Sequence, residues 1–160
     1  MPLRSDWSDR RCPIARSLDV VGDPWVLLVI REALVGTRRF DQFRDILGVS
    51  ESVLATRLRT MVEAGLLAKV PYKAGNRTQH EYVLTDAGAD LLPVVQALVL
   101  WGERHLPHAQ PGQLTIIHEG CGRPTASADT CTHCGLALTA EDVSWQRPWR
   151  QPDLTPLGSR

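Results

Sequence analysis

The stretch S-E-S-V-L-A-T-R-L-R-T-M-V-E-A-G, residues 50–65, decides the fold of this chain. Ser50 can cap a helix at its N-terminus, because its hydroxyl accepts a hydrogen bond from a backbone N–H that the helix leaves unpaired. Gly65 can end that helix, because glycine enters the left-handed conformation without steric cost. The apolar residues between them recur at helical spacing and are Leu54, Leu58, Met61 and Val62. The stretch therefore predicts an amphipathic helix.

The opposite face of this helix is small and polar. It carries Ser52, Ala55, Thr56, Arg59 and Glu63, with Arg57 at its edge. Small hydroxyl groups and arginines in the first turns suit a helix that enters the major groove of DNA. An ordinary surface helix shows the same pattern, so the helix alone does not separate the two interpretations.

The segments on either side favour the DNA-binding interpretation. Residues 39–47 place apolar side chains at helical spacing, and Gly48 separates them from the capped helix, as in a helix-turn-helix. Residues 66–72 and 79–84 are rich in strand formers, and the turn between them contains glycine and basic residues. A hairpin with a basic tip directly after the second helix is a wing, so the sequence predicts a winged helix-turn-helix.

Arg57 and Arg59 are two positions apart, so they point about 200° away from each other around a helix. Because Arg59 shares the small polar face, we expect it to read bases, whereas Arg57 reaches a phosphate or braces the domain. The full set of predicted DNA-contacting residues is Arg39, Ser50, Ser52, Thr56, Arg57, Arg59, Lys73 and Arg77.

The 160 residues carry no formal net charge, yet the charge is unevenly distributed. Residues 37–80 hold eight Arg or Lys against four Asp or Glu, which is compatible with a basic DNA-binding face. No apolar run approaches the length of a membrane span, and the N-terminus lacks the apolar core of a secretory signal. We therefore expect a cytoplasmic protein with no membrane partner. In that compartment the four cysteines are expected to act as metal ligands or reactive thiols rather than disulfides.

Three further helices are expected around the predicted winged motif. Cys12-Pro13 and Asp23-Pro24 each begin one, and the second is apolar nearly all round, which predicts a central buried helix. Thr85-Asp86 caps a long helix that ends before Pro107. The apolar residues of that helix cover more than one face, so we expect a dimer contact there. The residues predicted at the dimer interface are Val95, Leu98, Val99 and Trp101. We also expect a narrow apolar cleft between the central helix and the dimer helix that could take a small ligand.

Residues 12–106 resemble the HxlR-type winged-helix transcription regulators of bacteria, which are related to the MarR group. The segments that carry the resemblance are Cys12-Pro13, Gly22-Asp23-Pro24-Trp25, Arg39-Phe40, Leu54 with Arg57-Leu58, Gly65-Leu66, Glu81-Tyr82 with Leu84-Thr85, Gly88 and Trp101-Gly102-Glu103. The resemblance implies a homodimer that binds an inverted-repeat operator in double-stranded DNA. The family usually has a lysine between its glycine and tryptophan near the start, and in this chain that stretch reads Asp23-Pro24-Trp25.

Members of this family often use a cysteine at the position of Cys12, just before the proline at the position of Pro13, as a redox or electrophile sensor. Cys12 follows Arg10 and Arg11 and stands at a helix N-terminus, where the helix dipole and the cations favour a thiolate. A quiet thiol packed at the dimer interface is the alternative, and the sequence leaves both open.

The C-terminal part contains His118-x2-Cys121 and Cys131-x2-Cys134, with a glycine directly after Cys121 and Cys134. This is the spacing of a zinc knuckle, and three cysteines with one histidine close a tetrahedral structural site. About 30 residues with few large apolar groups need such a cross-link to fold. Two alternatives stay open: His133 replaces His118, or the tail is disordered with unbound thiols.

We therefore predict a mainly α-helical chain of the α+β class: a winged helix-turn-helix, a long dimerisation helix and a small zinc-ribbon-like appendage. The predicted boundaries are residues 12–107 for the winged domain and residues 113–143 for the extension, with flexible segments at residues 1–11 and 144–160. The predicted function is a sequence-specific transcriptional regulator, not an enzyme, with structural zinc and a possible small-molecule or electrophile effector. A protein-interaction module with a zinc-stabilised tail and a small metal hydrolase are the alternatives.

Overall fold

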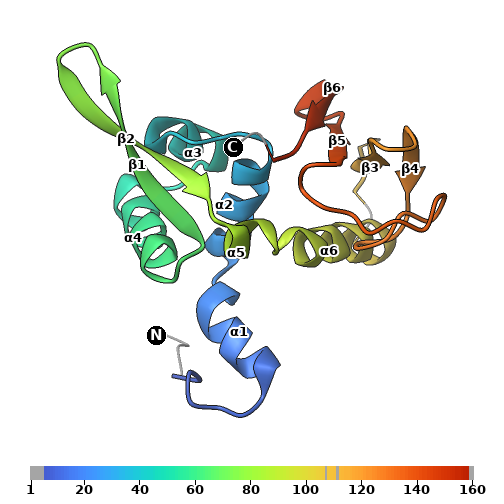
Figure 1. The fold of residues 1–160 in the computed structure, drawn as a ribbon, viewed down its shortest axis with the longest axis horizontal. Coiled ribbons are helices and arrows are strands. Elements are labelled where there is room, and N and C mark those ends of the chain that lie inside the picture. Colours follow the sequence, from blue (N-terminus) through green and yellow to red (C-terminus); the bar gives the residue numbers. More distant parts are fainter. Residues whose placement is uncertain (1–5, 107, 111, 159–160) are drawn as a thin grey trace.

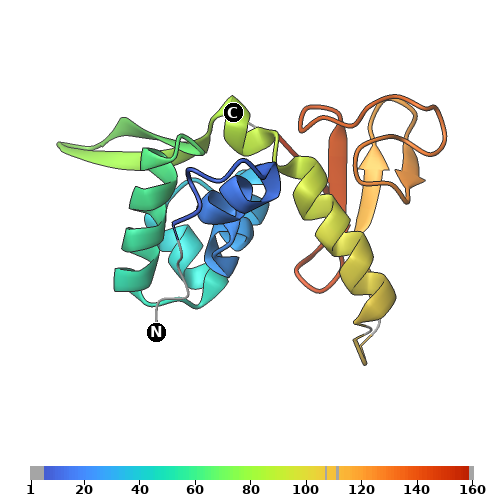
Figure 2. The same ribbon diagram turned by 90° about the horizontal axis from the view of Figure 1, so that it is seen from below.

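The computed structural model describes residues 6–106, 108–110 and 112–158. It has two parts, a winged domain and a C-terminal extension, and helix α6 leaves the first and carries the second along one side (Figures 1 and 2). The winged domain is helical with a two-stranded hairpin, and the extension is a four-stranded antiparallel sheet. The predicted α+β class with a winged helix-turn-helix is therefore confirmed.

Two helices that begin with proline open the winged domain. Helix α1 (Pro13–Val21) projects away from the body of the domain and buries none of its side chains within this chain (Figure 1). Helix α2 (Pro24–Leu34) is capped by Asp23, whose carboxylate accepts a hydrogen bond from the Trp25 N–H. Its side chains at Val29, Ile30 and Leu34 are fully buried, as expected for the central helix.

The helix-turn-helix lies against α2. Helix α3 (Phe40–Leu47) ends at Gly48, which adopts a left-handed conformation with φ of 63°. Helix α4 (Glu51–Glu63) then begins at Ser50, whose hydroxyl accepts a hydrogen bond from the Val53 N–H. The apolar stripe of α4 is buried at Leu54, Leu58 and Met61. Gly65, with φ of 74°, turns the chain out of α4 into the wing.

The wing is a hairpin of strands β1 (Leu67–Ala74) and β2 (Arg77–Leu84), which pair antiparallel along their whole length. The strands extend further than the sequence suggested, so that Gly75 and Asn76 alone make the turn. The root of the wing is tied to the helix-turn-helix, because the Tyr82 N–H donates to the Arg38 carbonyl at 2.8 Å. The tip projects beyond the helices (Figure 1).

The long helix expected after the wing is two helices. Thr85 caps the short α5 (Asp86–Ala89), and α6 (Leu92–His105) begins after a break at Asp90 and Leu91. Pro93 lies in the first turn of α6, where its missing N–H leaves no helical hydrogen bond unmade. The break lets α6 leave the winged domain at a new angle (Figure 2).

The extension is a sheet in the order β4-β3-β5-β6. Its strands are β3 (Thr115–His118), β4 (Arg123–Thr125), β5 (Val143–Arg147) and β6 (Gln151–Pro156). The prediction that residues 144–160 are flexible is therefore wrong for the part that the structure describes, which ends at residue 158. Trp145 and Leu157 are buried, and this burial holds the last strands in place.

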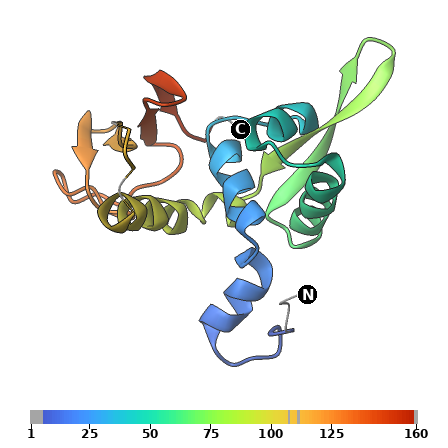
Figure 3. The same cartoon turned by 180° about the vertical axis from the view of Figure 1, so that it is seen from behind.

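The extension packs on the helices instead of hanging from a linker. The Trp145 indole N–H donates to the Gln96 side chain on α6 at 3.1 Å, and Arg147 pairs with Glu32 on α2 at 3.1 Å. The described chain ends beside α2, where the Gly158 N–H donates to the Leu34 carbonyl (Figure 3). One hydrophobic cluster thus extends from the winged domain into the extension.

Residues 6–11, expected to be flexible, form a turn held against α1. The Trp7 N–H donates to Asp19, and the Arg16 guanidinium donates to the carbonyls of Arg10 and Arg11. Residues 1–5, the remainder of that segment, lie outside the described residues, as do positions 107, 111, 159 and 160. Among the described residues, no helix has the length and apolar composition needed to span a bilayer.

Candidate nucleic-acid interface and metal centre

The predicted recognition helix α4 presents its small polar face to solvent. Ser52, Ala55 and Arg59 are exposed, and Thr56 is half-buried. The Thr56 hydroxyl donates to the Ser52 carbonyl at 2.9 Å, so its oxygen lone pairs stay available as acceptors. Glu63 approaches Arg59 only at 4.0 Å, and both side chains are more than half exposed, so this ion pair leaves Arg59 free to reach another partner.

Arg57 does not share that face. Its guanidinium forms an ion pair with Asp23, the cap of α2, at 2.7 Å, and its Nε is buried without a hydrogen-bond partner. The contact joins α4 to the start of the central helix. The geometry favours the bracing role for Arg57 over a contact with DNA phosphate.

The wing supplies the second basic element beside α4. Lys73 and Arg77 are exposed on either side of the tip turn. Arg39, at the start of α3, lies over the Tyr72 ring of β1 with its guanidinium carbon 5.8 Å from the ring centroid. Arg39 therefore connects the helix-turn-helix to the wing by a cation–π contact, which helps fix the angle between the two.

The start of α4 carries one carboxylate, and this carboxylate is already paired. Glu51 accepts a hydrogen bond from Arg44 of α3 at 2.8 Å. An unpaired carboxylate here would repel a DNA phosphate, and the ion pair with Arg44 reduces that repulsion. Ser50 lies beside it, with its hydroxyl 3.4 Å from that of Ser52.

The four predicted metal ligands come together in the extension. The ligand atoms of His118, Cys121, Cys131 and Cys134 all lie within 4.8 Å of one another. His118 comes from the end of β3, Cys121 from the turn before β4, and the two remaining cysteines from the loop between β4 and β5. His133, the alternative ligand, is exposed and does not belong to this cluster.

Three of the six separations between the ligand atoms are close to the edges of a zinc tetrahedron. With Zn–S of about 2.3 Å and Zn–N of about 2.0–2.1 Å, ligand atoms should be about 3.8 Å apart for two sulfurs and about 3.6 Å for sulfur and nitrogen. The Cys121 and Cys131 sulfurs are 3.7 Å apart. The His118 Nδ1 is 3.4 Å from the Cys121 sulfur and 3.3 Å from the Cys134 sulfur. The donor set thus fits a four-coordinate structural zinc with no open position.

Backbone N–H groups around the cysteines favour thiolates. Hydrogen bonds from the backbone at Cys134 and His133 lower the pKa of Cys131 to about 6, although burial of the thiol opposes the shift. Burial raises the pKa of Cys121, and a backbone hydrogen bond from Arg123 partly offsets this effect. The Cys121 and Cys131 thiols therefore both accept hydrogen bonds from the backbone that follows them.

Gly120 keeps the His118 ring in position. A Cβ added to Gly120 would lie 3.0 Å from Cε1 and 3.1 Å from Nε2 of His118. A larger residue would therefore crowd the imidazole and displace it by a few tenths of an ångström. Gly120 lies between His118 and Cys121 but is not itself a ligand, so its role was not predictable from the motif.

Cys12 lies far from this cluster, at the start of α1. It is exposed and occupies the N-cap position, with Pro13 as the first helical residue. This placement agrees with the predicted position of the thiol at a helix N-terminus. Its role as a sensor stays a prediction.

The predicted dimer surface of α6 divides into two parts. Leu98 and Trp101 are 50% and 55% exposed, and Val99 is partly buried. Val95 is only 5% exposed, so its assignment to the dimer interface is wrong. The reason is that α6 turns the face with Val95 and Gln96 inward, and the extension covers Gln96.

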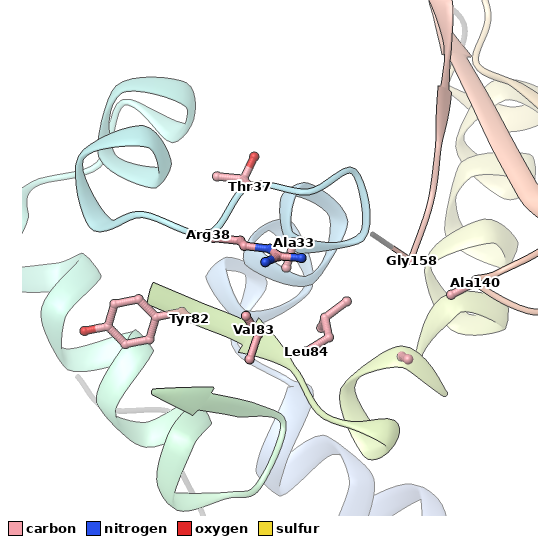
Figure 4. A pocket seen from close by; sticks show the side chains of 9 residues that line it. Ala33, Thr37, Arg38, Tyr82, Val83, Leu84, Ala140 and Gly158 are labelled. Atoms are coloured by element: carbon pink, nitrogen blue, oxygen red, sulfur yellow. The ribbon is translucent and has the colours of Figure 1, made fainter. Parts of the chain in front are cut away.

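A small pocket lies beside α2, but no residue of α6 lines it, so it is not the cleft expected between the central helix and the dimer helix. A cavity of about 20 Å³ remains between Ala33 and Thr37, the wing root at Tyr82 and Leu84, and the extension at Ala140 and Gly158 (Figure 4). This volume holds about one water molecule. The pocket therefore has no room for an organic effector in this conformation.

Comparison with known proteins assigns the chain to a family. Residues 20–110 match the model of the HxlR-like helix-turn-helix family. The chain belongs to this family of transcription regulators. It is 40% identical over 131 residues to Rv3095 of Mycobacterium tuberculosis, an uncharacterised HTH-type transcriptional regulator, and the match covers 82% of each chain.

Solved structures extend the likeness beyond the family domain. PA1607, described as a candidate transcription factor, matches with a TM-score of 0.69 at 36% identity, over 86% of this chain and 96% of its own. The redox regulator HypR in its reduced form matches with a TM-score of 0.55 at 29% identity, over 60% of this chain and 95% of its own. The first of these matches spans more of the chain than the winged domain alone.

Proposed function

We propose that this family member is a homodimeric, sequence-specific DNA-binding regulator in which α4 enters the major groove and the wing contacts the flanking backbone. The observation that supports this most directly is the exposed face of α4 with Arg59, adjacent to a wing whose tip bears Lys73 and Arg77. Family members act on transcription, and this face is where a helix-turn-helix reads DNA.

The proposed roles of the basic residues differ. Arg59 reads a base edge, because it is exposed on the face that would enter the groove. Lys73 and Arg77 bind phosphates, because they are exposed cations on the two sides of the tip turn. Arg39 holds the wing and contacts the backbone, and Arg57 braces α4 against Asp23. Ser50, Ser52 and Thr56 offer hydroxyl groups along the first turns of α4.

The experiment that tests this function is a titration of the full chain with DNA from upstream of its own gene. Fluorescence anisotropy at moderate salt would compare that fragment with a shuffled sequence of equal length. We expect tighter binding to the upstream fragment and a steep dependence on salt. Equal, weak binding to both would favour the alternative of a protein-interaction module.

Dimerisation is proposed through α6, with α1 beside it. Leu98 and Trp101 on α6 and Ile14 on α1 are large apolar side chains that this chain leaves exposed. Two recognition helices must also be held about 34 Å apart to read adjacent major grooves. In sedimentation experiments, Leu98→Arg should be a monomer. The same variant should bind DNA weakly. A wild-type chain that sediments as a monomer at micromolar concentration would contradict the proposal.

We also propose that the cluster in the extension binds zinc as a structural metal. The close spacing of the four ligand atoms supports this, and so does the burial of Cys131 and His118. Four protein ligands leave no site for a hydrolytic water, which counts against the metal hydrolase. The relatives are also named as transcriptional regulators. Elemental analysis of reduced protein should find about one zinc per chain.

A redox response through Cys12 is a second proposal, supported by its exposure at the N-cap of α1 and by the likeness to HypR, which is a redox regulator. The test is DNA affinity before and after treatment with a mild thiol oxidant, in the wild type and in Cys12→Ser, at a dose at which both chains are shown to keep their zinc. Both should bind equally when reduced, and only the wild type should respond. An unchanged wild type would make Cys12 a quiet thiol.

A further inference from the structure

Strand β5 connects helices α2 and α6 through buried polar side chains. Trp145 donates to Gln96 of α6 at 3.1 Å, and Arg147, two residues further on, reaches both carboxylate oxygens of Glu32 of α2 at 3.1 and 3.2 Å. Helix α2 is the centre of the winged domain, and α6 bears the proposed dimer surface. The strand therefore fixes the angle between the part that reads DNA and the part that pairs the subunits.

The Trp145–Gln96 hydrogen bond and the Arg147–Glu32 ion pair are both buried, so breaking either of them is costly. Trp145 and Gln96 are 0% exposed, and Glu32 and Arg147 are 1% and 5% exposed. A buried polar group that loses its partner keeps its desolvation penalty, so α6 cannot shift without a substantial cost. Exposed contacts between the two helices and the extension would not hold the angle in this way.

The metal cluster controls the position of β5 from the neighbouring strand. His118 lies at the end of β3, directly opposite Val143 in the β3–β5 pairing. The next residue, Glu119, donates its N–H to the Asp142 carbonyl at 2.7 Å, just before β5 begins. A shift of the His118 backbone is therefore passed to the start of β5.

A second connection leads from the cluster to the same glutamine. The Gln96 amide donates to the Ala128 carbonyl at 2.6 Å. Ala128 lies in the segment between Cys121 and Cys131, whose two ends are joined through the cluster. Both hydrogen bonds of the Gln96 side chain thus end on elements that the four ligands hold in place.

We propose that a thiophilic divalent cation of the zinc type, bound at this cluster, is an effector of DNA binding and acts through β5 and Gln96 on the angle of α6. The inference rests on the proposed function as a dimeric DNA-binding regulator. With the cation bound, α6 is held where the two recognition helices match adjacent grooves. When the cation leaves, β5 and the Ala128 segment loosen, α6 is free to move, and DNA binding weakens.

Such coupling is reciprocal, and this gives it a distinctive signature. If the cation raises the affinity for DNA by some factor, DNA must raise the affinity for the cation by the same factor. A metal that only keeps the extension folded, with no effect on α6, produces neither change. The two measurements together separate an effector from a purely structural ion.

The test uses the full, reduced chain and Zn²⁺ itself. Fluorescence anisotropy gives the affinity of the zinc-loaded and zinc-stripped protein for the upstream DNA fragment, and a chelator competition gives the zinc affinity with and without saturating DNA. We expect stripping to weaken DNA binding on the order of 5- to 150-fold, and DNA to tighten zinc binding by the same factor. Circular dichroism of the stripped protein should retain the helices of the winged domain.

Two variants break the connection without touching a ligand. Gln96→Met removes both hydrogen bonds from a side chain of similar size, and Trp145→Phe removes only the indole donor. In each, we expect zinc to be retained and the coupling factor to fall toward one. Ile116→Val is the matched control, because it removes one buried methyl group from the extension and leaves both connections intact; its coupling should equal that of the wild type.

Each remaining outcome decides the matter. If loaded and stripped protein both prefer the upstream fragment with equal affinity, the inference fails and the proposed function stands. If neither form distinguishes it from shuffled DNA, the proposed function fails and the inference with it. If the reduced chain takes up no zinc, the cation is not an effector, whatever the DNA affinity.

Discussion

In the winged domain, α2, α3 and α4 surround one apolar core in which Ile30, Phe43 and Leu58 have no exposed surface. The extension buries fewer large side chains, chiefly around Trp145, and adds a Cys/His cluster and polar connections to α2 and α6. The winged domain is thus stabilised mainly by hydrophobic burial, as ordinary domains are. The extension depends on its metal ligands and on the helices that it contacts, so the two regions should respond very differently to the same kind of change.

The largest expected effect is loss of the metal. Cys131→Ser removes a buried ligand and should abolish stable zinc binding, which contributes about 10–16 kcal/mol in small zinc-stabilised folds. New protease sites should appear at residues 113–140, and the helices up to His105 should persist. Limited proteolysis with mass spectrometry and far-ultraviolet circular dichroism would measure the two responses.

The matched control for this change is His133→Ala, which alters an exposed histidine of the same loop. It should keep both zinc and protease resistance. Unfolding of the whole chain on loss of zinc would mean that the winged domain cannot stand without the extension, and the contrast drawn between the two regions would be wrong.

The next effect is at the contact between the regions. Arg147→Met leaves Glu32 buried with one partner fewer, and breaking a buried ion pair in this way costs about 3–5 kcal/mol. Arg31 still binds Glu32 at 2.7 Å, so we expect the lower end of that range. Urea denaturation should detect the loss in the winged domain, although the substitution is in the extension.

A double substitution shows whether the loss comes from the stranded carboxylate. Glu32→Leu with Arg147→Met replaces the pair by apolar groups, which is often neutral or stabilising. It should recover most of the free energy of unfolding. If the double variant is as unstable as Arg147→Met, the single loss reflects packing and not charge.

The same contrast explains how far the sequence could be read. The helices of the winged domain can be predicted from apolar residues at every third or fourth position and from caps such as Ser50 and Asp23, because these features are local in the sequence. The four metal ligands could also be predicted, because two pairs of Cys and His residues at zinc-knuckle spacing limit where a metal can bind. These parts of the fold and site agreed with the structure.

Strands β5 and β6 were missed because their stabilising partners are distant. Arg147 and Trp145 pair with residues 115 and 49 positions away, and a segment rich in Pro and Arg resembles a disordered tail when read alone. Val95 was placed in the dimer interface for the same reason. The neighbouring residues in the sequence do not show that the extension packs along α6. Glu32 offered a weak signal, because it is an acidic residue in a helix that is apolar except for its neighbour Arg31.

The third effect concerns DNA and should be confined to the winged domain. Arg59→Ala should lose about 1–3 kcal/mol of discrimination at one base position, because its exposed side chain is the proposed base reader. Lys73→Ala should weaken binding to all sequences alike and reduce the salt slope by about one. Competition binding with single-base variants of the upstream fragment distinguishes the two patterns. An unchanged specificity ratio in Arg59→Ala would reassign base reading to another residue.

The smallest effect comes from the cap of α4. Ser50→Ala removes the hydroxyl that accepts from the Val53 N–H at 3.4 Å, a long hydrogen bond, so we expect a loss of about 0.5–1 kcal/mol out of the 0.5–2 kcal/mol typical of caps. Ser50→Gly is the control, since glycine at this position costs only a few tenths of a kcal/mol. Thermal unfolding measured without DNA keeps the proposed contact of Ser50 out of the result. Because α4 shares the core of α2 and α3, the midpoint of the winged domain should fall while zinc retention stays unchanged; a change in zinc retention would mean that the two regions unfold as one unit.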